Sequence, residues 1–166
     1  SNIVLMKDGE SISSNETLTF TNGIELKQEN DGNLALYVGA TLLWETGQHS
    51  TVGDYFTRLQ RGDGNFITRK GSISNNEGIL WKTQKVGPSG SYFFAVRADL
   101  TKVSVNQGEP NDVISEMWSA ATLATTQPTI TLAPTQQKAP AQSTTEPSTG
   151  LRPAPPTIVP PEELSF

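Results

Sequence analysis

The sequence contains no cysteine and a single histidine, His49, among its 166 residues. Without cysteine there is no disulfide, and a zinc site would have to be built almost wholly from carboxylates. We therefore expect neither a metal ion nor any other cofactor. One histidine also leaves no Ser-His-Asp set for catalysis, and the carboxylates Glu45 and Asp54 show no pairing typical of acid–base enzymes. The composition thus predicts a protein that is not an enzyme.

Long apolar runs and an excess of positive charge are also missing. No stretch approaches the roughly 20 apolar residues that a membrane-spanning helix requires. The formal net charge is −5, from 12 basic and 17 acidic residues, so the phosphate-neutralising surface of a nucleic-acid-binding protein is not expected. We accordingly predict no membrane span and no nucleic-acid partner.

What the sequence does contain is a repeated unit. Residues 26–46 read LKQENDGNLALYVGATLLWET, in which a polar turn separates alternating apolar segments typical of a β-hairpin. A second copy follows at residues 58–83, and a degenerate third copy ends with MWSA. The turn aspartates Asp31, Asp63 and Asp99 lie 32 and 36 residues apart.

All three tryptophans of the chain share this period. Trp44, Trp81 and Trp118 follow one another at intervals of 37 residues. A repeat of this length is a supersecondary unit that buries its apolar face only against its neighbours. We therefore expect the three indoles to meet around a shared axis as the structural core, each adding a large apolar area.

Turn residues such as Asp-Gly and Asn-Gly punctuate residues 1–121 at intervals of roughly ten. Together with the alternation in Thr17-Leu18-Thr19-Phe20, they predict short antiparallel strands in a barrel, sandwich or prism. The one helical candidate spans residues 114–124, but it carries the third tryptophan, where the other two copies have a strand. The expected fold class is all-β.

The composition changes abruptly at residue 122. Nine of the eleven prolines lie between Pro128 and Pro161, among Thr, Ser, Ala and Gln. Such a segment cannot build a packed core. We predict a repeat domain at residues 1–121 and an extended Pro/Thr/Ser-rich tail or linker at residues 122–166. The tail is either a flexible tether or an anchor in a neighbouring subunit, and the second alternative implies a homo-oligomer with tail-mediated contacts.

Two polar residues of each well-kept turn lie two positions apart, Asp31 with Asn33 and Asp63 with Asn65. On a strand this spacing puts both side chains on one face. A carboxylate beside a carboxamide matches the donors and acceptors of two neighbouring sugar hydroxyls. The same residues are also good turn formers, because Asp and Asn hydrogen bond to local backbone groups and glycine takes positive φ. Both interpretations are open at this point.

The chain resembles the bulb-type monocot mannose-binding lectins, or B-lectins, whose repeats carry QxDxNxVxY. The resemblance lies in this turn, in the strand that follows it and in the opening stretch LMKDGESISSNETLTFTNGIELKQENDGNLALY. The likeness covers roughly residues 3–121. It implies a β-prism II fold, in which three four-stranded antiparallel sheets surround a pseudo-threefold axis. It also implies a non-covalent site for mannose-type glycans on each sheet.

By this resemblance the first repeat supplies the best sugar site. Asp31 and Asn33 would bind the mannose O2 hydroxyl, and Tyr37 would reach O4. Ala35 would take the valine position under the ring carbons, and Glu29 stands at the glutamine position. We therefore predict these five residues as the first-repeat sugar site.

The likeness weakens along the chain. Gln28 lies one residue too early for the family's glutamine, and it points to the other face of the strand unless a bulge shifts it. In the third repeat only the carboxylate of Asp99 is kept, so we interpret that copy as a structural remnant. The second repeat has Arg69 in place of the tyrosine, and the sugar site that the resemblance implies there consists of Arg61, Asp63, Asn65 and Ile67.

Two short motifs have other meanings. Arg61-Gly62-Asp63 spells an integrin-recognition tripeptide, although the repeat already explains the aspartate. Asn15-Glu16-Thr17 is an N-glycosylation acceptor for a chain in a eukaryotic secretory pathway. We expect a secreted or cell-surface protein. We also expect Ser1 to be either a processed N-terminus or a remnant of cloning.

Two functions follow from these observations. The first is a lectin-like module that binds mannose-type glycans or glycoproteins. The second is a structural self-assembly module, such as a filament, coat or surface-layer subunit, with degenerate sugar pockets and a tail that docks on neighbouring subunits. A shallow sugar site gives roughly millimolar affinity for one monosaccharide, so a lectin with one good pocket is expected to oligomerise.

Overall fold

The computed structural model describes residues 1–123, and within them it has strands and no α-helix. A short 3-10 turn, η1 (Thr21–Gly23), precedes the first hairpin. No helix in this part of the chain has the length and apolarity to cross a membrane. The strands are β1 (Asn2–Lys7), β2 (Ser11–Ser13), β3 (Thr17–Thr19), β4 (Ile24–Gln28), β5 (Leu34–Val38), β6 (Thr41–Glu45), β7 (Tyr55–Leu59), β8 (Phe66–Ser72), β9 (Asn75–Lys82), β10 (Tyr92–Arg97), β11 (Lys102–Glu109) and β12 (Asp112–Ala121).

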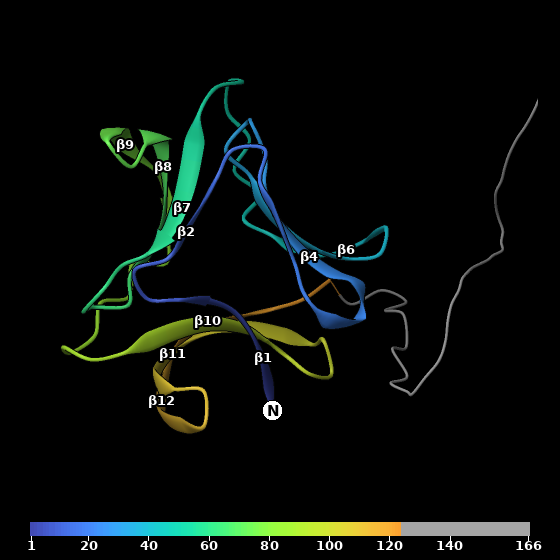
Figure 1. The fold of residues 1–166 in the computed structure, drawn as a ribbon, viewed down its shortest axis with the longest axis vertical. Coiled ribbons are helices and arrows are strands. Elements are labelled where there is room, and N and C mark those ends of the chain that lie inside the picture. The colour runs from blue at the N-terminus through green and yellow to red at the C-terminus, as the bar shows by residue number, and fades with distance from the viewer. Residues whose placement is uncertain (124–166) are drawn as a thin grey trace, which may run out of the picture. The chain divides into compact units, whose positions relative to one another are not determined.

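The strands form three four-stranded antiparallel sheets, which lie along the three sides of a triangle in Figure 1. Each repeat supplies three consecutive strands, and one strand from the N-terminal part of the chain completes each sheet. The first-repeat sheet has the order β3-β4-β5-β6, the second-repeat sheet β2-β7-β8-β9, and the third-repeat sheet β1-β10-β11-β12. The predicted β-prism II fold is confirmed, and most of the helical candidate at residues 114–124 lies in strand β12.

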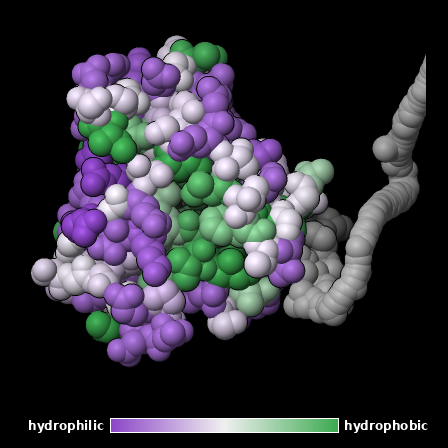
Figure 2. All heavy atoms as spheres, viewed as in Figure 1, coloured by the Kyte–Doolittle hydropathy of each residue, from purple (hydrophilic) through white to green (hydrophobic). Residues whose placement is uncertain are grey.

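The three tryptophans meet at the centre, as their period predicts. Trp44 lies 6.1 Å from Trp81 and 6.0 Å from Trp118 between ring centroids, and Trp81 lies 6.0 Å from Trp118. All three contacts are edge-to-face, the geometry that the charge distribution of aromatic rings favours. Phe94 packs 5.8 Å from Trp44 and 4.4 Å from Phe66. Figure 2 shows hydrophobic residues gathered in the middle of this view, with hydrophilic residues around them.

The aspartate of each repeat forms the turn that leads into the repeat's second strand. The Oδ1 atoms of Asp31 and Asp63 each accept a hydrogen bond from the backbone N–H two residues later, at 3.0 Å. In the third repeat Asp99 does the same at 3.1 Å. The turn-forming interpretation of these aspartates is therefore confirmed, and it explains why Asp99 persists where the rest of the motif is lost.

Glycine follows this aspartate in the first two turns for steric reasons. Gly32 and Gly64 have φ of +95° and +73°, and a Cβ at either position would overlap a side chain of the next sheet, Leu80 or Tyr92 respectively. In the third turn Leu100 adopts φ of +63° and is 3% exposed. The buried leucine side chain thus occupies a conformation that L residues disfavour.

Removing one indole tests the shared core. We expect Trp44→Ala to lower the free energy of unfolding by about 3–5 kcal/mol, because Trp44 is 6% exposed and contacts both other tryptophans. Urea denaturation monitored by circular dichroism measures this loss. Trp44→Phe keeps an aromatic ring and serves as the control, with a smaller expected loss. A loss below about 1 kcal/mol for Trp44→Ala would contradict the shared core.

Candidate functional site

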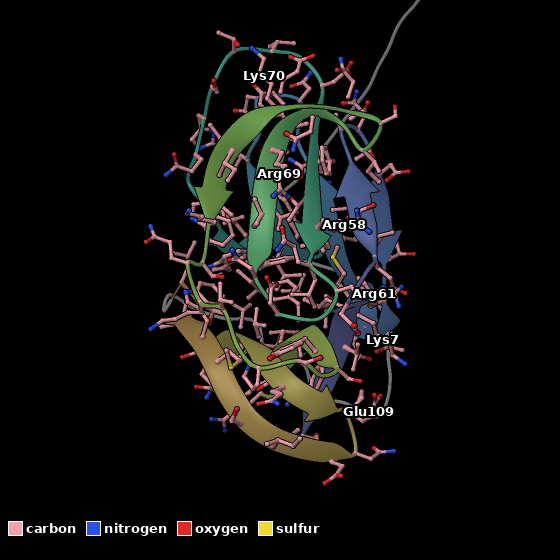
Figure 3. The ribbon with its side chains drawn as sticks, turned by 90° about the vertical axis from the view of Figure 1, so that its left-hand side faces the viewer. Lys7, Arg58, Arg61, Arg69, Lys70 and Glu109 are labelled. Atoms are coloured by element: carbon pink, nitrogen blue, oxygen red, sulfur yellow. The ribbon has the colours of Figure 1, made fainter. Side chains whose placement is uncertain are left out.

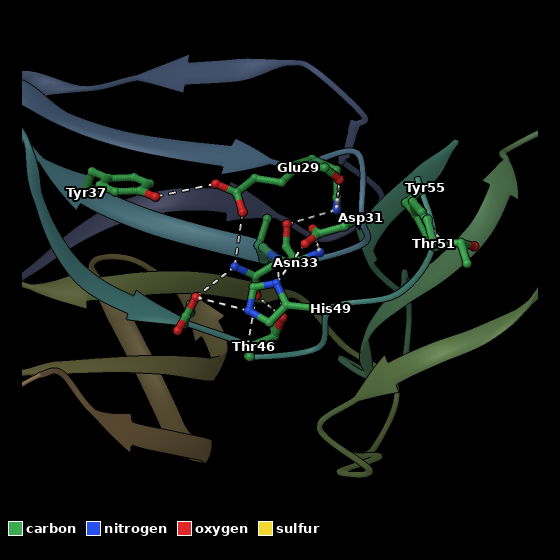
Figure 4. Close-up of polar contacts among 12 residues, drawn as sticks. Glu29, Asp31, Asn33, Tyr37, Thr46, His49, Thr51 and Tyr55 are labelled. Carbon is green, nitrogen blue, oxygen red and sulfur yellow. Dashed lines mark hydrogen bonds and ion pairs between the residues drawn. The ribbon is translucent and has the colours of Figure 1, made fainter. Parts of the chain in front are cut away.

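A cluster of polar side chains lies on the outer face of the first-repeat sheet, centred on Asn33. The residues come from the β4–β5 turn, from β5 and β6, and from the loop after β6 (Figure 4). Because side chains alternate along a strand, the inward neighbours on β5 fill the core while this face stays available. We call this set the Asn33 cluster, and its members are Glu29, Asp31, Asn33, Tyr37, Glu45, Thr46 and His49.

The side-chain amide of Asn33 takes part in four hydrogen bonds, two donated and two accepted. The Nδ2 group donates to Glu29 Oε1 at 3.2 Å and to Glu45 Oε1 at 2.8 Å. The Oδ1 atom accepts from Thr46 Oγ1 at 3.0 Å and from Gly47 N at 2.9 Å. Asn33 is 1% exposed. Both donors are therefore in use, and the amide fixes the positions of two carboxylates at the surface.

The exposed side of the cluster consists mainly of hydrogen-bond acceptors. The Tyr37 hydroxyl donates to Glu29 Oε2 at 3.4 Å, a long bond that leaves both groups able to bind elsewhere. Burial, and after it the negative charge of Glu29, raises the pKa of Tyr37 above its usual value, so the hydroxyl keeps its proton at neutral pH. Carboxylates beside a protonated phenol match a ligand that carries several hydroxyl groups.

His49 lies over the cluster and binds Asp31 (Figure 4). Its Nδ1 is 2.7 Å from Asp31 Oδ2, and its Nε2 is 3.8 Å from Glu45 Oε1. The hydrogen bond to Asp31 raises the pKa of His49 and lowers the pKa of Asp31. No group of three or more His, Asp or Glu side chains within residues 1–123 is placed to hold a metal ion.

A depression of about 410 Å³ adjoins this cluster. It is open beside Glu29 and Asp31, and its far side is formed by the β2–β3 turn, which carries the exposed Asn15. Glycosylation at Asn15 stays a prediction. A glycan attached there would occupy the same space as a ligand of the depression.

The structure brings together most of the residues predicted for the first sugar site. Glu29, Asp31, Asn33 and Tyr37 contact one another or share a partner, whereas Ala35 lies on the same face with no exposed surface. Gln28 points into the core, as expected from its position, and its Oε1 accepts from Thr57 of the second-repeat sheet at 2.5 Å.

Sequence reasoning missed three members of the cluster. From the sequence, His49 is weighed only as a metal ligand or a catalytic residue, and Glu45 only as a catalytic carboxylate. Thr46 was not considered, although a Trp-x-Thr spacing marks the equivalent positions in two repeats. Thr83 donates from Oγ1 to Asn65 Oδ1 at 3.3 Å, as Thr46 does to Asn33. The Trp-x-Thr spacing was therefore a readable signal.

The second repeat is shifted by one residue from its predicted alignment. The backbone N–H of Gln60 donates to Asn65 O at 2.8 Å, just as that of Glu29 donates to Asn33 O at 2.8 Å. Gln60, rather than Arg61, is thus the equivalent of Glu29, because this turn has one extra residue. Arg69, at the tyrosine position, donates from its NH2 group to Gln60 Oε1 at 3.0 Å.

The remaining residues predicted for the second site are mostly enclosed. The carboxylate of Asp63 accepts hydrogen bonds from Gln60 Nε2 at 3.1 and 3.2 Å. It is therefore not free, whereas integrin recognition through the Arg-Gly-Asp tripeptide requires a free carboxylate. Asn65 is 9% exposed and Ile67 is 2% exposed. Of the predicted set only Arg61 is exposed, so the other exposed groups of this face come from residues outside that set.

The outer face of the third-repeat sheet has lost the cluster altogether. Val103 and Val105 face the core and have 0% and 1% exposure. The outward positions hold Lys102, which pairs with Glu116 at 2.6 Å, and Asn106, which donates to Ser104 at 2.9 Å. The prediction of a structural remnant in this repeat fits these contacts.

The only histidine of the chain reports directly on the cluster. We expect the pKa of His49 to lie above the ordinary 6.5 and to fall toward it in Asp31→Asn, because the hydrogen bond to Asp31 is its main cause. The stabilising effect of His49 is then present below pH 6.5 and is lost as the pH rises through the folded-state pKa. A titration followed by NMR of the imidazole protons measures both values. An unchanged pKa in Asp31→Asn would contradict the pairing.

Several solved lectin structures share the architecture of this chain. A monomeric monocot mannose-binding lectin from Gastrodia elata aligns with a TM-score of 0.55 at 20% identity, over 69% of this chain and 91% of the lectin. The mannose-specific agglutinin from snowdrop (Galanthus nivalis) bulbs, solved with methyl-α-D-mannoside, aligns at 0.53 and 23% identity, over 64% and 92%. The Polygonatum cyrtonema lectin, complexed with monomannoside, aligns at 0.53 and 18%, over 64% and 92%.

These similarities lie in the fold. No protein-family model matches the chain, and no curated protein sequence matches it significantly. The aligned structures nevertheless share the three four-stranded antiparallel sheets that the sequence resemblance predicted. The chain therefore has the β-prism II fold of the bulb-type monocot mannose-binding lectins.

Proposed function

We propose that this chain is a carbohydrate-binding, lectin-like module that binds mannose-type glycans through the Asn33 cluster. The observation that carries the proposal is the convergence of Glu29, Asp31, Tyr37 and Glu45 around one buried amide, next to an open depression. The aligned lectins bear names that specify mannose, which supports the same ligand class. In this proposal the protein acts outside the cell, as a secreted or surface protein.

Hydroxyl groups of a sugar are the natural partners of this site. Each sugar hydroxyl can donate to a carboxylate oxygen of Glu29 or Glu45 and accept from the Tyr37 hydroxyl. Two hydrogen bonds from Asn33 Nδ2 hold the carboxylates of Glu29 and Glu45 in place before a ligand arrives, so little side-chain entropy is lost on binding. Of the cluster, Glu29 and Asp31 line the depression of about 410 Å³, a volume in the size range of small-ligand sites.

A sugar that binds Asp31 has to share this carboxylate with His49 or displace the imidazole. The imidazole of His49 is paired with Asp31 Oδ2, and the His49 side chain is 54% exposed. An exposed ion pair contributes little to stability, so a ligand displaces it at small cost. Binding to Asp31 therefore gains as the pH rises through the pKa of His49, when the imidazole loses the proton that attracts the carboxylate.

Matched aspartate substitutions test the sugar site. We expect Asp31→Asn to weaken binding of methyl-α-D-mannoside roughly tenfold from a millimolar dissociation constant, because a charged acceptor is lost. Asp99→Asn is the control, since both aspartates accept the same backbone hydrogen bond but only Asp31 belongs to the cluster. Chemical-shift titration by NMR measures both variants. No saturable shift in the unsubstituted protein would refute mannoside binding.

Self-assembly is the second candidate function. The edge strands β9 and β12 display Ile79 and Ile114 at 52% and 68% exposure, and an unpaired strand edge can add a strand from another chain. The tail predicted at residues 122–166 lies outside the described residues, apart from Thr122 and Leu123. These exposed edges favour contacts between copies without requiring a sugar.

Deleting residues 125–166 tests tail-mediated assembly. If the tail joins subunits, the shortened chain has the mass of a monomer by light scattering while the full chain has a multiple of it. Ile114→Ser in the full chain separates an edge-strand contact from a tail contact. An identical mass for the full and shortened chains would count against the tail-mediated alternative.

A further inference from the structure

The outer faces of the first-repeat and second-repeat sheets correspond position by position. Ala35 pairs across the ladder with Lys27 on one side and Glu45 on the other. Ile67 pairs in the same way with Arg58 and Lys82. The strand register thus gives an internal comparison that does not depend on sequence alignment.

Charge differs at three of the equivalent positions, whereas Lys27 and Arg58 are both basic. Glu45 of the first sheet corresponds to Lys82 of the second, and Tyr37 corresponds to Arg69. Glu29 corresponds to the neutral Gln60, as the shared backbone hydrogen bond shows. A face that presents carboxylates in the first sheet therefore presents guanidinium and ammonium groups in the second.

A depression of about 350 Å³ on the second-repeat sheet is lined by arginines, and Lys82 is not part of its lining. Figure 3 shows Lys70, Arg69, Arg58, Arg61 and Lys7 along the same side of the molecule. Three of them line the depression together with neutral side chains, so its lining is cationic and partly apolar. The lining consists of Phe56, Arg58, Gln60, Arg61, Arg69, Ile73 and Asn76.

The lining arginines have no acidic partners within residues 1–123. The ion pairs within residues 1–123 join other side chains, such as Arg97 with Asp99 and Lys102 with Glu116 of the third repeat. The nearby carboxylate of Asp63 is already bound by Gln60 Nε2. The positive charge of the depression is thus not neutralised by the described part of the protein.

Arg69 has an unused donor. Its NH2 group donates to Gln60 Oε1 at 3.0 Å, but its Nε atom is buried and has no hydrogen-bond partner. A buried donor without an acceptor is costly, and most such groups in proteins are satisfied. Because Arg69 lines the depression, a ligand there is next to its guanidinium, whereas Nε itself is covered by protein atoms.

We infer that the second-repeat sheet binds an acidic saccharide, one that carries a sulfate or a carboxylate. Guanidinium groups bind such anions through two parallel hydrogen bonds, which makes Arg58, Arg61 and Arg69 suited to the charged substituent. Ile73, which is 54% exposed, supplies apolar surface for the sugar ring. The chain as a whole carries a net charge of −5, so this affinity is local to the depression. The saccharide part of the inference rests on the proposed function, whereas the anionic part rests on the arginines.

Titration calorimetry at low salt tests this inference on the full chain. The probes are an oligosaccharide of sulfated dextran, an oligogalacturonate, a neutral dextran oligosaccharide of equal length, and inorganic sulfate. We expect one or both acidic oligosaccharides to bind and the neutral one not to bind, with the two acidic arms showing which substituent is preferred. Arg58→Gln and Arg69→Gln should each weaken binding by roughly tenfold to a hundredfold.

The controls separate a site from general charge attraction. Arg97→Gln removes the same charge from an arginine of the third-repeat sheet and should change the affinity less than twofold. Asp31→Asn should also leave it unchanged, because it alters only the Asn33 cluster. Equal weakening by Arg97→Gln, equal binding of the neutral dextran, or inorganic sulfate binding as tightly as the saccharides would overturn the inference. Loss of mannoside binding with intact acidic-saccharide binding would refute the proposed function alone.

Discussion

Three indole rings, one from each repeat, meet edge to face at the centre of the fold, with their centroids 6.0 to 6.1 Å apart. None of the repeats can bury its inner face alone, so the sheets depend on this mutual contact for their core. The rings lie on the edge strands β6, β9 and β12, each paired with the neighbouring inner strand, β5, β8 or β11. Stability is thus concentrated on the inner faces, and the outer faces are free to differ.

The outer faces do differ, and their chemistry follows from a few positions. In the first-repeat sheet, Asn33 gathers carboxylates around itself. In the second-repeat sheet, the positions equivalent to Tyr37 and Glu45 hold Arg69 and Lys82. One scaffold therefore presents an acceptor-rich face and a cationic face, which are suited to hydroxyl groups and to anions respectively. The third face has internally paired side chains and no comparable cluster.

The features that repeat along the chain could be predicted from the sequence. The tryptophan period indicated the shared core, and the Asp-Gly-Asn turns indicated the hairpins, because both depend on local chemistry or on spacing. The alignment of Arg61 with Glu29 could not be corrected from sequence, since one extra residue in a turn can be placed on either side of Asp63. The role of His49 was also hidden, because the loop after β6 folds back onto Asp31 only in three dimensions.

Sequence also indicated that Asp31 and Asn33 share a face, but it did not show that Asn33 is buried. Burial depends on the neighbouring strand, because Glu45 of β6 and Thr46 just after it cover the amide. The site is therefore built from carboxylates positioned by an amide, whereas the motif predicts direct contacts of that amide with sugar. This difference concerns how the site is organised, and it leaves the proposed ligand class unchanged.

A crystal structure of the protein grown with both methyl-α-D-mannoside and a sulfated oligosaccharide would test the central claim most directly, namely that equivalent faces of one threefold scaffold bind different saccharides. The account predicts density for the mannoside beside Glu29 and Asp31, and density for the sulfate against Arg58 and Arg69. Both ligands on one face, or empty outer faces at saturating concentrations, would contradict it.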